Sequence, residues 1–364
     1  MDNKDLTAIE RIERELEKID KKENTLFFYV LDTKGNPSGS LEYIYKLAKM
    51  LADNEYNVQM LYQEDDEFIG VGDWLGEAYA SLPHADIAKD EINVSPSDVL
   101  FIPELFSNIM IQTKKLPCKR IAILQNYDYM LEQMPMAAQW GDLGILEAIT
   151  NTDINGELVK SVFPYVKTTT ISPYIDPMFG CTDEPKKMII NIIAKNQSDI
   201  NKIIKPFYWK YPMYKWVSFR DLRGFPKENY AELLREGIAT IWVDEDSSFG
   251  YGALEAMKSG NIVMAKTTNL TQTWMIDGDN GLTNACLWFD NFHEIHKLIA
   301  SVIRAWITDN VPSEVAEAAE KSLSHYSVDQ TKSQLLGYVE NLMQKRKDEL
   351  KSIISFINTK TNEE

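Results

Sequence analysis

The sequence contains few cysteines and no long apolar run. Cys118, Cys181 and Cys286 are odd in number, lie far apart and lack the spacing of metal ligands, which favours a reduced, intracellular protein. No apolar stretch approaches the roughly 18 residues that a membrane span needs, and the charged N-terminus does not resemble a signal peptide. We therefore expect a cytoplasmic protein.

Positive charge is also scarce, because Lys and Arg total 38 against 55 Asp and Glu, for a formal net charge of −17. This balance argues against a nucleic acid as partner, although a small anionic ligand needs only a local group of N–H donors and a few cations. With 44% hydrophobic and 26% charged residues, the composition is typical of a globular chain. A length of 364 residues predicts two domains.

Residues 238–260 form the clearest functional pattern. The apolar run 238–243 is typical of a strand buried on both faces. Good helix formers over 253–259, followed by Gly260 as a stop, predict a helix. The first turn of such a helix has free N–H groups that suit phosphate, although an ordinary strand-to-helix connection fits the spacing equally well. The candidate ligand-binding loop consists of Phe249, Gly250, Tyr251 and Gly252.

The segment FGYGALEAMKSGNIVMA resembles the signature of retaining, nucleotide-sugar-dependent glycosyltransferases with the GT-B fold, glycosyltransferase family 4 in particular. That signature has two glutamates eight positions apart; the second falls on Glu255, and Ser247 stands at the first. The resemblance implies that Glu255 holds the donor's ribose hydroxyls and that the amides of 249–252 hold its sugar and phosphate. Because serine lacks a carboxylate, we expect Asp246 to take over the role of the missing glutamate near the reacting carbon.

The first half of the chain predicts a βαβ unit. After a leading helix over 4–22, the apolar strand 26–31 runs into a loop that contains Gly39 and Ser40, and a helix with one apolar side follows. GNPSGS lacks the spacing of a dinucleotide-binding fingerprint. The resemblance places this loop at the cleft, with Gly39 and Ser40 near the donor; a tight strand-to-helix turn explains the same residues.

The strand predicted over 119–124 delivers Gln125 and Asn126 at its carboxyl end, the edge at which open α/β sheets bind ligands. Many members of the resembled family have a histidine here that contacts sugar or acceptor. An amide can exchange hydrogen bonds with hydroxyls, but it cannot transfer a proton. We therefore expect Asn126 to belong to the site without acting as an acid or base.

Residues 169–179 have the turn-forming residues of an interdomain linker and resemble the family's linker, in which a proline precedes an aspartate and a phenylalanine follows. The implied fold class is α/β with the GT-B architecture: two Rossmann-like domains whose parallel sheets face each other across a cleft. The expected segments are the acceptor-side domain 1–172, the nucleotide-sugar-binding domain 173–340, and 341–364 in a helix that packs back on the first domain.

The strand predicted over 188–194 ends at Lys195, where the resembled family usually has an arginine that contacts the diphosphate. Lysine keeps that charge without the bidentate fork. Farther on, 202–220 interleaves lysines with aromatic residues, which permits contact with the cytoplasmic face of a membrane or with a lipid acceptor. A helix and a strand whose rings pack inward is the simpler interpretation. The turn-rich segment 277–282 resembles the family's DG-x-NG element.

Asp244 and Asp246 permit interpretation as a metal-binding D-x-D triplet. A helix N-terminus and a lysine can instead neutralise the leaving phosphate, so we expect no metal and no cofactor. The predicted activity is transfer of a sugar, with retention, from a nucleotide-diphosphate sugar to a glycan or lipid-linked glycan. The departures from the family pattern leave two alternatives: a non-catalytic binding or scaffolding relative, and a hydrolase or epimerase of nucleotide sugars.

Overall fold

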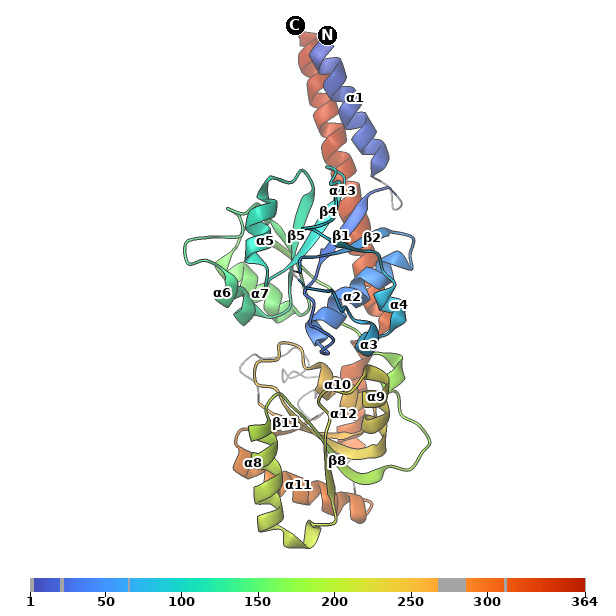
Figure 1. The fold of residues 1–364 in the computed structure, drawn as a ribbon, viewed down its shortest axis with the longest axis vertical. Coiled ribbons are helices and arrows are strands. Elements are labelled where there is room, and N and C mark those ends of the chain that lie inside the picture. The colour runs from blue at the N-terminus through green and yellow to red at the C-terminus, as the bar shows by residue number, and fades with distance from the viewer. Residues whose placement is uncertain (1–2, 20–22, 65, 268–285, 311–312, 364) are drawn as a thin grey trace. The chain divides into compact units, whose positions relative to one another are not determined.

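The computed structural model describes residues 3–19, 23–64, 66–267, 286–310 and 313–363. The chain divides into two compact units (Figure 1). The first contains residues 1–151, 155–171 and 332–364, and the second contains 152–154 and 172–331. The boundaries expected from the sequence stood after residues 172 and 340. Among the described residues, no helix combines the length and apolar character needed to cross a bilayer.

The first unit is built on a seven-stranded parallel sheet with the order β3-β2-β1-β4-β5-β6-β7. Its strands are β1 (Thr25–Tyr29), β2 (Asn57–Tyr62), β3 (His84–Asp86), β4 (Val99–Pro103), β5 (Lys119–Leu124), β6 (Glu147–Thr150) and β7 (Lys167–Thr170). Its helices are α1 (Asn3–Lys18), α2 (Gly39–Ala52), α3 (Gly72–Leu75), α4 (Glu77–Ala80), α5 (Ser107–Gln112), α6 (Tyr127–Gln133), α7 (Asp153–Val162) and most of α13 (Val328–Glu363), with a 3-10 turn, η1 (Thr113–Lys115).

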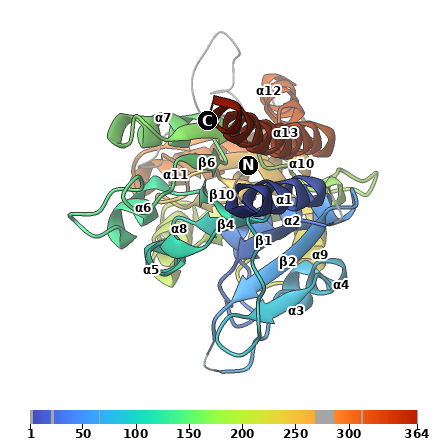
Figure 2. The same ribbon diagram turned by 90° about the horizontal axis from the view of Figure 1, so that it is seen from above.

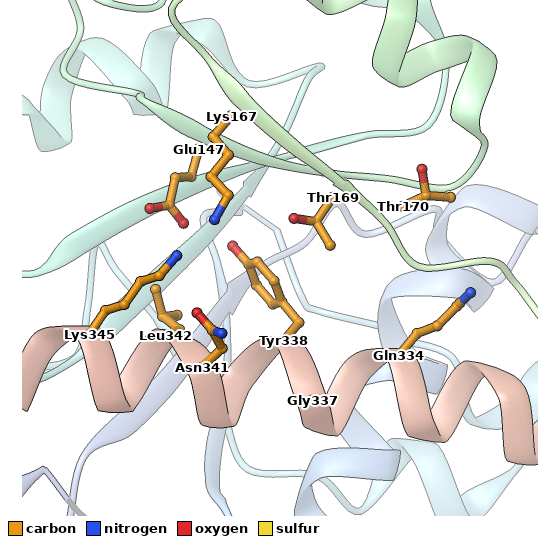
Figure 3. A pocket seen from close by; sticks show the side chains of 10 residues that line it. All are labelled: Glu147, Lys167, Thr169, Thr170, Gln334, Gly337, Tyr338, Asn341, Leu342 and Lys345. Atoms are coloured by element: carbon orange, nitrogen blue, oxygen red, sulfur yellow. The ribbon is translucent and has the colours of Figure 1, made fainter.

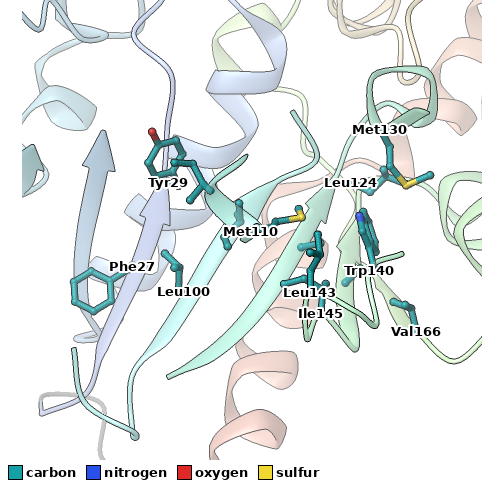
Figure 4. Packing of buried hydrophobic residues seen from close by; sticks show 14 of the residues in the cluster. Phe27, Tyr29, Leu100, Met110, Leu124, Met130, Trp140, Leu143, Ile145 and Val166 are labelled. Carbon is teal, nitrogen blue, oxygen red and sulfur yellow. The ribbon is translucent and has the colours of Figure 1, made fainter. Parts of the chain in front are cut away.

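Apolar strands of this kind become buried on both faces of a parallel sheet. One face of the first sheet packs into a core that contains Leu100, Ile102 and Leu124 (Figure 4). The fully buried Trp140 belongs to the same core, and its ring stacks on that of Phe163. Helices α1 and α13, at the two ends of the chain, lie side by side in both views of this unit (Figures 1 and 2). Four apolar residues of α13 are buried: Leu335, Val339, Leu342 and Met343.

The second unit contains a five-stranded parallel sheet with the order β12-β11-β10-β8-β9. Its strands are β8 (Lys187–Ala194), β9 (Ser218–Asp221), β10 (Gly237–Val243), β11 (Ile262–Lys266) and β12 (Cys286–Phe289). Its helices are α8 (Gln197–Lys210), α9 (Lys227–Glu236), α10 (Tyr251–Lys258), α11 (Phe292–Ile307) and α12 (Ser313–Ser324), with 3-10 turns η2 (Pro177–Phe179) and η3 (Pro212–Tyr214). All seven residues of the central β10 are buried, so the strand expected there is confirmed.

The segment 202–220 forms the end of α8, η3 and the start of β9, and its aromatic rings divide into two groups. Phe207 is fully buried, and Tyr208, Tyr211, Tyr214 and Phe219 pack against the same core. The expectation that the rings pack inward is therefore correct for these five residues. It is wrong for the two tryptophans, because Trp209 is 76% and Trp216 is 56% exposed.

Candidate active site

The central element of the second unit is the loop between β10 and α10. Gly250 adopts the left-handed backbone conformation, with φ 81° and ψ 43°, at the N-cap of α10. This region costs other residues about 1–2 kcal/mol, so a glycine is favoured there. The backbone N–H of Gly250 donates to Ser247 Oγ at 2.9 Å, which closes the loop. At the far end, Gly260 has φ +71°, which confirms the predicted helix stop.

The acidic residues of this loop lie beside lysines from neighbouring strands. Lys195, which follows β8, places its Nζ 2.7 Å from Asp244 Oδ1 and 3.9 Å from Asp246 Oδ2. Lys266, the last residue of β11, places its Nζ 3.4 Å from Glu245 Oε1. Since parallel strands end at one edge of a sheet, the topology gathers these charges there. A phosphate group that competes with these carboxylates would find two ammonium groups at the edge of the sheet from which the loop to α10 starts.

Of the three remaining residues of the expected loop, Tyr251 is the first residue of α10, and Phe249 and Gly252 serve packing. Phe249 is buried and contacts the rings of Tyr251 and Tyr326 edge-on, with centroids 4.7 and 5.1 Å apart. A Cβ atom on Gly252 would lie only 3.2 Å from Ile193 Cδ1, so glycine allows α10 to approach β8 closely. Both residues therefore set the position of the helix from which Glu255 projects.

Glu255 lies in the second turn of α10, and its side chain is buried, with 6% of the residue exposed. The helix is anchored one turn later, where Ser259 Oγ donates to the Glu255 carbonyl at 2.9 Å. Lys258 Nζ donates to the Ile175 carbonyl at 2.7 Å and ties the same helix to the segment before η2. The predicted residues of the second unit thus all lie on the segments that follow the carboxyl ends of β8 and β10: Lys195, Asp246, Ser247, Phe249–Gly252 and Glu255.

The carboxyl edge of the first sheet contains the other predicted residues. Gly39 is the first residue of α2, whose N-cap is Ser38. The Ser40 carbonyl accepts a 3.0 Å hydrogen bond from Gln125 Nε2, which links α2 to the end of β5. Asn126 Oδ1 caps α6 by accepting from the Asp128 N–H at 3.0 Å. These contacts give Asn126 a structural role that the sequence did not predict.

A residue that sequence reasoning missed, Glu104, lies directly after β4 at this edge. Its Oε1 accepts hydrogen bonds from the N–H groups of Gln125 at 3.1 Å and Asn126 at 2.8 Å. Burial raises the pKa of this carboxyl group to about 7, against the opposing effect of the two hydrogen bonds. The sequence does contain a signal for Glu104, because a charged residue just past a predicted buried strand is a site candidate. Lys266 stands at the end of the predicted strand 261–265 in the same way.

Comparison with known proteins adds to this geometry. No protein-family model matches the chain. A sucrose-phosphate synthase from Thermosynechococcus elongatus superposes with a TM-score of 0.63 at 11% identity, covering 88% of this chain and 100% of that one. Anabaena HepE in complex with UDP-glucose superposes with a TM-score of 0.61 at 12% identity, covering 87% and 99%. The chain has the GT-B fold. The pneumococcal O-GlcNAc transferase GtfA, in complex with UDP and GlcNAc, gives a TM-score of 0.60 at 9% identity over 89% and 99%.

One curated relative also matches this GT-B chain in sequence. It is an alpha-1,6-glucosyltransferase of Actinobacillus pleuropneumoniae serotype 7, which is 24% identical over 194 residues. The aligned stretch is 50% of this chain and spans just over half, 56%, of the relative's own length. The GT-B fold predicted from the sequence is confirmed by the superpositions with the solved structures. The segment 277–282, which carries the other resemblance in the second domain, lies outside the described residues.

Proposed function

We propose that this chain is a cytoplasmic, retaining glycosyltransferase that moves a sugar from a nucleotide-sugar donor to a glycan or lipid-linked glycan. The observation that carries the proposal is the combination, at the carboxyl edge of the second sheet, of the left-handed Gly250 loop, the α10 N-terminus, Lys195 and Glu255. Backbone N–H donors and lysines bind phosphate, and a carboxylate on α10 accepts hydrogen bonds from ribose hydroxyls. UDP and UDP-glucose in two of the structurally similar proteins support a uridine nucleotide as the first donor to test.

Charge stabilisation in the proposed reaction uses only groups of the chain. Lys195 and Lys266 exchange their loop carboxylates for the oxygens of the departing diphosphate, and the α10 N-terminus adds its dipole. Asp246, whose side chain is 63% exposed, is then released from Lys195 and faces the positive charge that develops on the sugar ring. This arrangement needs no metal, so transfer is expected to persist in EDTA.

A second candidate function is a nucleotide-binding subunit without transfer activity. Ser247 favours it, because the Ser247 hydroxyl is engaged by the Gly250 N–H and closes the loop. A serine cannot supply the carboxylate found at this position in the family that the sequence resembles. The two candidates share the donor site and differ only in turnover.

A binding experiment followed by a turnover experiment separates these candidates. Calorimetry with a series of nucleoside diphosphates should show selective binding of one of them. Glu255→Ala should lower that affinity roughly tenfold to a hundredfold, since a hydrogen bond to a charged group is worth about 1.5–3 kcal/mol. Glu228→Ala, an exposed acid in the first turn of α9, is the matched control and should bind as wild type. Unchanged affinity in a folded Glu255→Ala protein would remove Glu255 from the site. A radiolabelled-donor screen with and without EDTA then decides between transferase and binding subunit.

Contact with a membrane surface is part of the same proposal. The exposed Trp209 and Trp216 stand among Lys205, Lys210 and Lys215, and such side chains favour an anionic lipid interface. Sedimentation with vesicles that contain anionic lipid should recover more of the wild type than of a Trp209→Ser, Trp216→Ser variant. Equal recovery of the two proteins would show that this surface does not bind lipid.

A further inference from the structure

A polar pocket lies in the first unit, between the start of β6, the edge strand β7 and helix α13 (Figure 3). Its volume is about 300 Å³, at the small end of the range for small-molecule sites. Glu147 and Lys167, which line it, are the first residues of their strands. The pocket therefore begins at the amino edge of the sheet, opposite the carboxyl edge that contains Ser40 and Asn126. None of the residues proposed for the donor site line it.

The alternation of side chains along β7 explains which residues reach the pocket. Thr168 turns toward α7, since its Oγ1 lies 3.3 Å from the position of a Cβ on Gly156. Lys167 and Thr169, one residue before and after, therefore point to the other face, where α13 lies. On α13 the lining residues recur at helical spacing, and a Cβ built on Gly337 meets no atom within 4 Å. The glycine leaves room above the helix.

The charges in the pocket do not balance. Glu147 Oε1 lies 2.7 Å from Lys119 Nζ, so this carboxylate already has a cationic partner. Figure 3 shows the ammonium groups of Lys167 and Lys345 converging from opposite walls. Lys345 is the largest cause of a lowered pKa at Lys167, as expected for two like charges brought together. Three lysines therefore surround one glutamate in a chain whose overall charge is negative.

A hydrogen-bond donor completes this group. The Tyr338 hydroxyl is buried against the pocket and lies beside the Glu147 carboxylate. Burial, together with the nearby Glu147 carboxylate, raises the pKa of Tyr338, so the hydroxyl keeps its proton. The Thr169 hydroxyl and the Asn341 amide add polar groups to the wall.

We propose that this pocket binds a phosphate-bearing small molecule of the size of a sugar phosphate. The phosphate group lies between the ammonium groups of Lys167 and Lys345, each of which donates a charge-assisted hydrogen bond. The Tyr338 hydroxyl and the side chains of Thr169 and Asn341 contact the rest of the ligand. Binding removes the repulsion between the two lysines, which supplies a driving force that a neutral ligand lacks.

Calorimetry on the full chain, with three probes in low salt, tests the proposal. A hexose 6-phosphate should bind with a Kd below about 1 mM, and the unphosphorylated hexose should not bind. Lys167→Gln and Lys345→Gln should each weaken binding at least tenfold. Lys351→Gln, an exposed lysine on α13 outside the pocket, is the matched control and should bind as wild type. Inorganic phosphate that binds as tightly as the hexose phosphate would assign the site to free phosphate.

Thermal melting adds a second measurement, in which Lys345→Gln affects the melting temperature differently with and without ligand. Without ligand, Lys345→Gln should melt no lower than wild type, because it removes a repulsive charge. With 5–10 mM hexose phosphate, on the order of ten times the expected Kd, the melting temperature should rise clearly for wild type and much less for the variant. Absence of binding at this concentration, or wild-type affinity in both lysine variants, overturns the proposal. Neither result bears on nucleotide binding, which the Glu255 variants measure separately.

Discussion

The carboxyl edges of the two sheets are built from different chemistry. In the first unit, the part of the edge formed by β4 and β5 is internally bonded: Gln125 Nε2 donates to the Ser40 carbonyl, and Glu104 accepts hydrogen bonds from two backbone N–H groups. In the second unit, the edge carries part-exposed ion pairs between Lys195 or Lys266 and the acids 244–246. Exposed ion pairs contribute little to stability, about 0–1 kcal/mol, and are easily replaced by a charged ligand. The β4–β5 part of the first edge is therefore fixed before any ligand binds, whereas the second edge is able to exchange partners.

The largest expected effect is on how the free energy of unfolding depends on pH, and it comes from Glu104 at the first edge. Glu104 has a native pKa of about 7, above the ordinary glutamate pKa of about 4.5, so the native state holds the proton more tightly than the unfolded state. The stabilisation is fully present below about pH 4.5 and is lost as pH rises to about 7, a change of roughly 3 kcal/mol. Glu104→Gln, neutral at every pH, should match wild type near pH 4 and exceed it at pH 8 in urea denaturation.

The control for this prediction is Glu157→Gln, an exposed acid on α7 in the same unit. Its denaturation midpoints should follow those of the wild type at both pH values. If Glu104→Gln also follows the wild type across the range, burial does not hold a proton on this carboxyl group.

The next effect concerns the second edge. Asp246→Asn removes the acid proposed to replace the missing glutamate, and it should slow sugar transfer at least ~10-fold, about 1.4 kcal/mol of transition-state stabilisation. Nucleoside diphosphate affinity should barely change, because the phosphate is held by the lysines and α10. Transfer assays and calorimetry on the same preparation measure the two quantities. Wild-type transfer by Asp246→Asn would end the substitution hypothesis.

An effect of similar size tests the backbone of the loop. Gly250→Ala places a Cβ at φ 81° and should destabilise the second unit by about 1–2 kcal/mol. Gly337→Ala in α13 has open space and helical neighbours, so it should stabilise the first unit by about 0.5–1 kcal/mol. Opposite shifts in denaturation midpoint are expected from the same chemical change. A harmless Gly250→Ala would mean that the loop does not require the left-handed conformation.

Local patterns predicted much of this architecture. The apolar run before Asp244, the glycine at 250 and the stop at Gly260 specify a strand, a loop and a helix, because each depends only on neighbouring residues. The pairing of Lys195 with Asp244 and the burial of Glu104 depend on strands that are distant in sequence, so no local pattern contains them. The aromatic segment shows the same limit: periodicity could not say that Phe207 enters the core while Trp209 stays exposed.

The chain order of the first unit has a consequence for biosynthesis. Its last part, Lys332–Glu364, follows the whole second unit in sequence, so the ribosome delivers it last. At 5–20 residues per second, translating residues 172–331 takes on the order of ten seconds or more. During that time the nascent first unit lacks Leu335, Val339 and the other apolar side chains that α13 later buries. The uncovered surface is then open to chaperones. Truncation within α13 should therefore reduce the yield of folded protein, although α13 contributes no residue to the proposed donor site.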